Sequence, residues 1–424
     1  MALRTLAPPM PNGVKALIRE DYVKLDPHAP EIFEWMRKQE VFHEFAHARD
    51  TFIVHFRGTW GILRCWNQPM ATARCGLLHS AYTRAGFYFR LFDIENPGSR
   101  AVCRDLVGIE AEEQIWKYCY TQQFWNDLEW IDFHPKLLPT GYKPSTEPWM
   151  IKLGEPLNPA GYTVPSRIHA GETVHMSAKD IANYFVVFVA DIADQWSDVS
   201  TYRNVYHEEV PGRLWPGTGR PSMPFNVFSK MLRSARPYLD VIPPVFNNCT
   251  EVISFADEYT ATDCYWKAVQ GEHKLEQKEL EALYRKSTEL NPYIGEPHVM
   301  LSQCFFKRGA FAEAAHHAIS AIDLLQQWAT HWDKRNSFSQ WLGFARMMLL
   351  RSKRRMKGLS LLPSLQLSLP EMREPGATYL QDVVAEFDEY TADEVPHEDQ
   401  HSKEQPARST STRELNATLP HARL

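Results

Sequence analysis

The sequence predicts a mainly α protein, and two features carry that prediction. In the stretch DTFIVHFRGTWGILRCW, the large apolar residues Phe52, Phe56 and Trp60 recur at every fourth position, which is the spacing of one helix face. In SAKDIANYFVVFVADIADQ, Ser177 is a suitable N-cap, and Asp180 three residues later is close to a capping box. Helices with an apolar stripe and their own start signals are expected to pack together as a bundle.

Further elements are expected in chain order. NQPMATARCGLLHSAY places Pro69 in the first turn of a helix, and AVCRDLVGIEAEEQIWKYCY is again amphipathic. Short turns join these pieces, so successive helices should pack antiparallel. The proline-rich excursion at 131–172 is irregular, with a short hairpin expected near GYTVPSRIHAGETVHM. Much later, WDKR at 332–335 looks like a helix start with an ion-paired face.

Composition limits the kind of protein this is. The chain has 424 residues, is 44% hydrophobic, and carries 46 basic against 52 acidic side chains. That charge balance does not indicate a nucleic-acid or membrane-surface partner. The 7 cysteines contain no C-x-x-C pair, which favours buried thiols in a reducing compartment. The N-terminus is a poor signal peptide, and the longest apolar run, YFVVFVA, is too short to span a bilayer, so we expect a cytoplasmic protein.

Changes in composition along the chain predict its organisation. After Tyr390 there is no aromatic residue, and such a segment cannot bury enough apolar surface to offset the entropy of ordering it. The expected parts are an irregular lead at 1–30, a helical domain at 31–215, a connector at 216–272, a helical repeat region at 273–358 and a mostly disordered tail at 359–424.

The repeat region carries a spacing of small residues. LYRKSTELNP, ending at Pro292, is similar to the end of a tetratricopeptide repeat. That alignment predicts the packing positions of the next helical pair: Leu301, Ser302, Phe305, Ala314, Ala318 and Ala321. Alanines at such steps let paired helices approach closely. Fewer than three repeats rarely stand alone, so the pair should lean on the next helix, FSQWLGFARMMLL, and on the domain before it.

The stretch HEFAH at 43–47 satisfies the H-E-x-x-H pattern of zinc proteases. A protease of this kind needs a further ligand, such as a downstream Glu110 or Glu112. The metzincin continuation is absent, because Ile53 stands where a third histidine is required. The pattern is short, and ARD follows it like a helix boundary, so we do not interpret it as a protease site.

A second constellation fits a metal site better. His55 stands on one predicted helix, His79 follows in CGLLHS at the end of the next, and VADIAD supplies Asp191 and Asp194. This order resembles the HD superfamily of all-helical metal-dependent phosphohydrolases, over about residues 45–200. The resemblance implies that His55, His79 and Asp191 bind one divalent metal (Mn, Fe or Zn). It also implies a bound water that attacks phosphorus or carbon, with His47 or Asp194 orienting that water or a ligand.

More narrowly, HARDTFIVHFRGTWGILRCWNQP followed by GLLHSAY is similar to an uncharacterised HD-like family, some members of which carry a tetratricopeptide-like region. In that signature His47 belongs with His55 and His79. No activity follows from it.

This chain departs from the HD pattern at Ser80, where the metal-bridging aspartate is expected. A hydroxyl is a weaker ligand for a hard metal than a carboxylate, so a one-metal site is expected instead of a two-metal site. Nearby, Arg84 could bind an anionic substrate. The residues leave open whether His55 and His79 bind a metal or only form hydrogen bonds between helices.

Two functions therefore follow from the sequence. The first is an HD-like metal-dependent hydrolase of a small anionic or phosphorylated molecule. The alternative is a non-catalytic scaffold whose tetratricopeptide-like helices bind a protein or peptide. We expect neither nucleic-acid nor membrane partners.

Overall fold

The computed structural model describes residues 8–44, 46–47, 50–82, 91–121, 151–166, 168–194, 225–247 and 253–358, with the backbone alone described between 43 and 50 and at 255. The chain forms two compact units, Met1–Leu361 and Leu362–Leu424, and every described residue lies in the first. The tail predicted at 359–424 therefore lies outside the described residues, and the predicted domain boundaries stay predictions.

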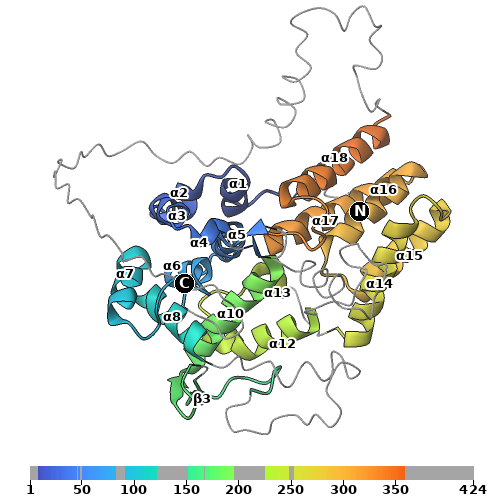
Figure 1. Ribbon diagram of the computed structural model, residues 1–424. Helices are drawn as coiled ribbons and strands as arrows, with labels where there is room; N and C mark the ends of the chain where they lie inside the picture. The colour runs from blue at the N-terminus through green and yellow to red at the C-terminus, as the bar shows by residue number, and fades with distance from the viewer. Residues whose placement is uncertain are drawn as a thin grey trace, which may run out of the picture. The chain divides into compact units, whose positions relative to one another are not determined.

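The described part of the chain is mainly helical, as predicted (Figure 1). Up to Asn247 the described elements are α1 (Asn12–Ile18), α2 (Tyr22–Leu25), α3 (Ala29–Arg37), α4 (Val41–Glu44), β1 (Ala46–His47), β2 (Asp50–Thr51), α5 (Phe52–Cys65), α6 (Met70–Leu77), α7 (Pro97–Val107), α8 (Ile109–Tyr120), β3 (Tyr162–Pro165), β4 (Thr173–Met176), α10 (Ala178–Asp194), α12 (Phe225–Ala235), η1 (Arg236–Tyr238) and α13 (Pro244–Asn247). The later helices are α14 (Phe255–Gly271), α15 (Gln277–Leu290), α16 (Gly295–Lys307), α17 (Phe311–Trp328) and α18 (Phe338–Met356).

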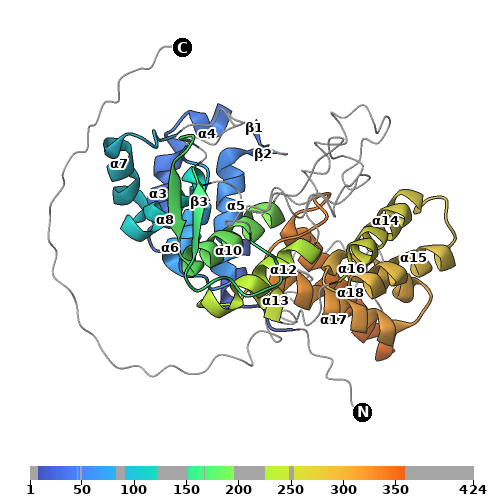
Figure 2. The same ribbon diagram turned by 90° about the horizontal axis from the view of Figure 1, so that it is seen from below.

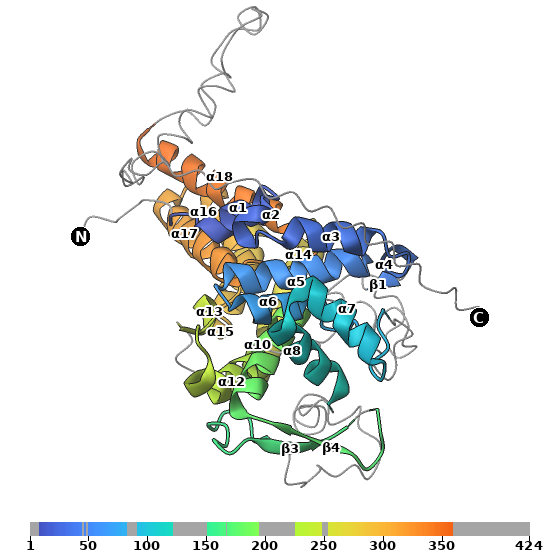
Figure 3. The same ribbon diagram turned by 90° about the vertical axis from the view of Figure 1, so that its left-hand side faces the viewer.

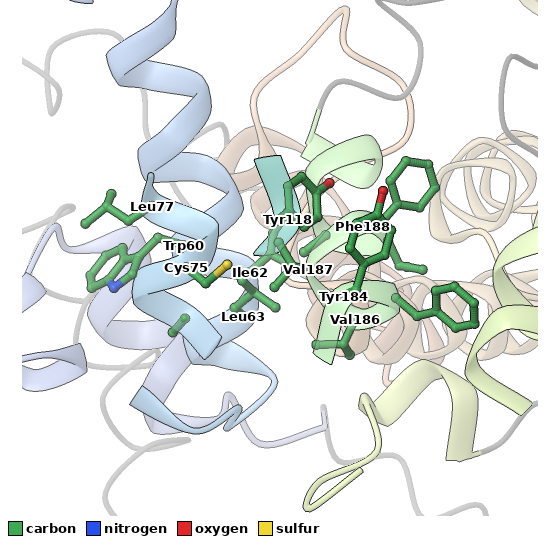
Figure 4. Close-up of a cluster of buried hydrophobic side chains, with 14 of the residues drawn as sticks. Trp60, Ile62, Leu63, Cys75, Leu77, Tyr118, Tyr184, Val186, Val187 and Phe188 are labelled. Carbon is green, nitrogen blue, oxygen red and sulfur yellow. The ribbon is translucent and has the colours of Figure 1, made fainter. Parts of the chain in front are cut away.

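Helix α5 is packed on several sides, since it contacts α1, α2, α4, α6 and α10 (Figure 2). The predicted stripe residues Phe52, Phe56 and Trp60 are all buried. Figure 4 shows side chains from α5, α6, α8 and α10 that form one apolar cluster, among them Trp60, Leu63, Cys75, Leu77, Tyr118, Tyr184 and Val187. This cluster fixes the three helices that carry the candidate site.

Helix α10 begins as the sequence predicts. The Ser177 hydroxyl accepts a hydrogen bond from the Asp180 backbone N–H at 3.1 Å, and the Asp180 carboxylate accepts one from the Ser177 backbone N–H at 3.0 Å. This reciprocal pair is the predicted capping box. The helix is apolar on most of its circumference, with Phe185, Val187 and Ala190 all buried. It is therefore surrounded by other elements instead of facing solvent on one side.

The predicted hairpin is present as the antiparallel pair β3–β4 (Figure 3). Its register pairs Tyr162 with Met176 and Pro165 with Thr173. Gly161, directly before β3, has φ +77°, and a β-carbon there would lie 2.3 Å from the Met176 carbonyl oxygen, so only glycine fits at this position. The hairpin leads directly into α10.

Helices α14 to α18 pack as consecutive neighbours, each against the next (Figure 1). The six packing positions predicted in this segment are all buried: Leu301, Ser302, Phe305, Ala314, Ala318 and Ala321. The Ser302 hydroxyl donates to the Ala314 carbonyl at 2.7 Å, which joins α16 to α17.

The predicted helix start at WDKR is wrong. Residues 331–336 form an irregular connection, and α18 begins only at Phe338 with Ser337 as its N-cap. Asp333 is buried and accepts hydrogen bonds from the Tyr265 hydroxyl at 2.6 Å and the Arg335 backbone N–H at 2.9 Å. The Arg335 contact is a local turn, whereas the contact with Tyr265, 68 residues away, cannot be inferred from local patterns; together they hold the segment outside a helix.

The C-terminal helices also pack against the first helical group, as the repeat argument predicts. Trp66 at the end of α5 donates its indole N–H to the Gln327 carbonyl on α17 at 2.9 Å. Phe225 stacks on Tyr293 with ring centroids 4.5 Å apart. Two hydrophobic clusters result, one centred on α5, α6, α8 and α10 and one on α14–α18. Across the described residues, no helix is both long enough and apolar enough to cross a membrane.

Candidate metal centre

The structure brings together three of the predicted site residues. His55 of α5, His79 just after α6 and Asp191 of α10 offer ligand atoms that all lie within 4.8 Å of one another. The three residues are 4%, 2% and 3% exposed, respectively. Among the described residues, this is the one group of three or more His, Cys, Asp or Glu with metal-binding spacing.

His55 is held at both ring nitrogens. Its Nε2 lies 3.1 Å from Oδ1 of Asp191, and its Nδ1 lies 2.7 Å from Oδ2 of Asp194. Asp191 and Asp194 are three positions apart on α10, so both face α5. Gly58, one turn after His55, makes the second contact possible, because a β-carbon there would lie 2.0 Å from Oδ1 of Asp194.

The sequence predicts His79 at the C-terminal end of a helix, and in the structure His79 lies in the turn directly after α6, two residues beyond Leu77. Its Nδ1 lies 2.8 Å from the carbonyl oxygen of Gly76, an acceptor in the last turn of the helix. A side chain that satisfies a terminal helix carbonyl competes with continued helix, which explains the early end. The other ring nitrogen, Nε2, lies 3.5 Å from Oδ2 of Asp191.

Asp191 receives a further hydrogen bond that the sequence did not predict. The Tyr118 hydroxyl on α8 lies 3.3 Å from Oδ2 of Asp191 and donates to it. The Tyr118 ring also packs edge-on against His79, with ring centroids 5.8 Å apart. Tyr118 therefore orients both a carboxylate and an imidazole of the group.

The charges of the group are strongly coupled. Burial disfavours the imidazolium form of His55, but hydrogen bonds and ion pairing with Asp191 and Asp194 outweigh burial and raise the pKa of His55 to about 9. In the absence of another cation, a proton on His55 therefore compensates the buried carboxylate charge. A metal ion entering the group would replace that proton.

The hydrogen bonds also set the tautomers. The Gly76 carbonyl can only accept, so Nδ1 of His79 is the protonated nitrogen, and an ionised Asp194 requires the same of His55. When both rings are neutral, the lone pair of each lies on Nε2, which faces Asp191, and in the metal-free protein the extra proton of His55 occupies this position instead. Lone pairs and a carboxylate repel unless a cation lies between them. Outer-shell carbonyl or carboxylate acceptors on Nδ1 are the usual support of metal-binding histidines.

Two of the separations, each to a different oxygen of Asp191, are close to those between ligands of one metal ion. Two ligand atoms about 2.1 Å from one ion lie about 3.0–3.4 Å apart in octahedral or tetrahedral geometry. The distances of 3.1 and 3.5 Å from the two Nε2 atoms to Asp191 are close to that range. Two imidazoles with one carboxylate suit Zn, Fe or Mn and leave coordination positions open.

Some of the remaining predicted residues lie outside the described part of the chain, and others lie within it. Arg84 and the side chain of His47 lie outside the described residues, as do the side chains of His43 and Glu44 in the protease pattern. Ser80 lies in the turn after α6. Asp194, expected to orient water or a ligand, contacts Nδ1 of His55, the ring nitrogen that does not face Asp191.

The structure supports neither a zinc-protease site that uses Glu112 nor a nucleophilic Cys75 activated by His79. Glu112, a possible third ligand of a protease site, is buried and accepts hydrogen bonds from Arg100, Arg104 and Tyr82, so its carboxylate is already neutralised. Cys75 is 2% exposed, and burial raises the pKa of its thiol well above the ordinary value, which keeps it from acting as a nucleophile beside His79.

Sequence reasoning missed Gly58 and Tyr118. A glycine within a helical stripe was a signal for close approach, since glycine costs helix stability and persists where a neighbour needs the space. Nothing in the local sequence around Tyr118 indicated its partner, 73 residues away.

A match to one protein-family model covers part of this site. Residues 36–123 match a family model described as a domain of unknown function (DUF6817). The matched range contains His55 and His79 but not Asp191, and it covers well under half of the chain. No curated protein and no solved structure matches the chain.

Proposed function

We propose that this protein is an HD-like metal-dependent hydrolase that binds one divalent metal through His55, His79 and Asp191 and acts on a small anionic substrate. The observation that supports it most is the commitment of both Nδ1 atoms to acceptors, which turns both Nε2 lone pairs toward the Asp191 carboxylate. This buried group needs a positive charge, which a proton on His55 supplies in the metal-free protein and which a divalent metal would supply in its place.

A divalent ion bound at this group supplies Lewis-acid chemistry and lowers the pKa of a coordinated water toward neutrality. The protein's own residues position the ligands. Asp194 fixes the ring of His55, the Gly76 carbonyl fixes the ring of His79, and Tyr118 holds the carboxylate of Asp191. His47 is proposed to orient the attacking water, and Arg84 to bind the negative charge of the substrate.

The site is proposed to hold one metal and not two. Ser80 replaces the carboxylate that would bridge a second ion, and Asp194 is engaged with His55. Within the described residues no fourth His, Cys, Asp or Glu joins the group. Three protein ligands with open positions are sufficient for hydrolysis at one metal.

The test is the metal content of the purified full-length protein after loading with Mn, Fe or Zn. We expect one equivalent of metal in the wild type and none in His55→Ala or His79→Ala. His317→Ala is the matched control, because His317 is also a histidine at a helix interface but lies on α17, and it should retain the metal. A wild-type protein that stays metal-free under all three loadings would exclude the hydrolase.

The second candidate is a scaffold that binds a peptide through the tetratricopeptide-like helices. The observation in its favour is the burial of all six predicted packing positions in α16 and α17. The same loading experiment separates the two candidates, since a scaffold needs no metal.

A further inference from the structure

One side chain from the connection between α17 and α18 reaches the end of α10. Lys334 is 3% exposed, and its ammonium group donates to the Ala193 carbonyl at 3.2 Å. It also donates to the His331 carbonyl at 2.6 Å and lies 3.4 Å from the Thr330 hydroxyl. A buried ammonium is costly unless it is hydrogen-bonded, so these acceptors hold it in one place.

The carbonyl that Lys334 contacts belongs to the peptide unit that joins Ala193 to Asp194. The last four carbonyls of a helix lack partners within the helix, and a cation there also complements the helix dipole. Lys334 therefore orients the peptide plane from which the Asp194 side chain leaves the helix. That side chain accepts the 2.7 Å hydrogen bond from Nδ1 of His55.

Asp194 is thus constrained from two directions. On one side its carboxylate fits into the space left by Gly58, where a β-carbon would come within 2.0 Å. On the other side its backbone is tied to Lys334. A shift of the final turn of α10 would lengthen the contact with His55 or press the carboxylate against α5.

The connection that carries Lys334 is itself rigid. Asp333 accepts from Tyr265 on α14, and the Trp341 indole N–H on α18 donates to the Asp333 carbonyl at 2.8 Å. Buried Glu296 on α16 accepts from the backbone N–H groups of Trp332 and Asp333. The C-terminal helices therefore hold Lys334 through several independent anchors.

We propose that Lys334 is a positioning residue of the metal centre, which acts through Ala193 and Asp194 on His55 and links the C-terminal helices to the site. The proposal rests on the proposed function for its effect on metal, but its effect on the contact between His55 and Asp194 does not require a metal. The C-terminal helices thereby become part of the site's support.

The first measurement is Co²⁺ affinity and the visible spectrum of the Co²⁺ complex in full-length Lys334→Met, which keeps the length of the side chain. We expect about tenfold weaker binding, as for other outer-shell changes, and an altered spectrum. Trp66→Phe is the matched control, because it removes another hydrogen bond between the same two regions, to Gln327, without touching α10. It should lower stability and leave Co²⁺ affinity and the spectrum unchanged.

The second measurement uses the metal-free protein. The Nδ1 proton of His55, donated to a carboxylate, should give a downfield NMR resonance that is absent in His55→Gln. Lys334→Met should shift this resonance, and Trp66→Phe should not. If the methionine variant does not fold, Lys334→Gln, which keeps an N–H donor without the charge, takes its place.

The outcomes are distinct. An unchanged His55 resonance in folded Lys334→Met, or an equal shift in Trp66→Phe, overturns the positioning role. Unchanged Co²⁺ affinity in a variant of a metal-binding wild type overturns it as well. A wild type that binds no metal rejects the hydrolase, and the His55 resonance then still decides the role of Lys334.

Discussion

In the described part of the chain, the pair His55 and His79 and the pair His298 and His317 lie where helices pack together, and their surroundings differ in charge. His55 and His79 have ring centroids 5.2 Å apart, and so do His298 and His317. Burial disfavours the imidazolium form in both regions. Beside Asp191 and Asp194 the pKa of His55 is nevertheless raised to about 9.

In the second pair, burial and neighbouring histidines lower the pKa of His298 to about 3 and that of His317 to about 4. The two rings share one hydrogen bond, with their Nδ1 atoms 3.0 Å apart, which suits a neutral pair. The comparison teaches that two histidines in contact between helices do not by themselves make a metal site. The carboxylate of α10 decides which pair attracts a cation.

Removing that carboxylate should have the largest effect. Asp191→Asn takes away both a proposed ligand and the charge that compensates His55. We expect metal affinity to fall by about 100-fold or more, and the free energy of unfolding of the metal-free protein to fall by about 3 kcal/mol. Metal titration and urea unfolding measure the two effects. Unaltered metal affinity would mean that the two histidine pairs do not differ in the proposed way.

The next test concerns the space that Gly58 leaves for the Asp194 carboxylate beside His55. Gly58→Ala places a β-carbon against the Asp194 carboxylate and should cost about 2 kcal/mol, the typical cost of overpacking. Gly343→Ala on α18 is the control, because nothing lies within 4 Å of a β-carbon there. That change should stabilise the protein by about 0.5–1 kcal/mol through helix propensity. Equal effects of the two alanines in urea unfolding would refute the steric role of Gly58.

The second pair should make the protein sensitive to acid. The folded-state pKa values of His298 and His317 lie below the unfolded value of 6.5, so their contribution to stability is complete above pH 6.5. It is lost as the pH falls from 6.5 toward 4, by up to about 1.4 kcal/mol per pH unit for each histidine. His317→Gln should flatten this slope in urea unfolding at pH 7, 6 and 5. If the variant keeps the wild-type slope, the acid sensitivity arises from groups other than His317.

The smallest expected effects concern the two capping serines. Ser177→Ala at the start of α10 and Ser337→Ala at the start of α18 should each cost about 1 kcal/mol, because each removes a side chain that accepts from the backbone. Neither should alter metal affinity, since Ser177 lies some four turns from Asp191. A loss of metal in Ser177→Ala alone would show that the whole of α10, and not its last turn, positions the carboxylate.

The sequence by itself predicted helices α5, α6, α10, α16 and α17, the capping box of α10 and the β3–β4 hairpin, and its resemblance to the HD superfamily pointed to His55, His79 and Asp191; helices α12 and α14 lie in the stretch predicted as a connector. The helices and the capping box follow from local signals, namely apolar periodicity and a serine followed by an acid, whereas the site residues follow from the order of His and Asp that resembles the HD superfamily. The tertiary structure decided the rest. The contact between His55 and Asp194 joins residues 139 positions apart. Gly58 and Tyr118 gain their roles only where helices approach one another. Lys334, read from sequence as part of a helix start, is held outside a helix by Asp333, Tyr265 and Trp341, because buried hydrogen bonds between distant elements outweigh local helix propensity.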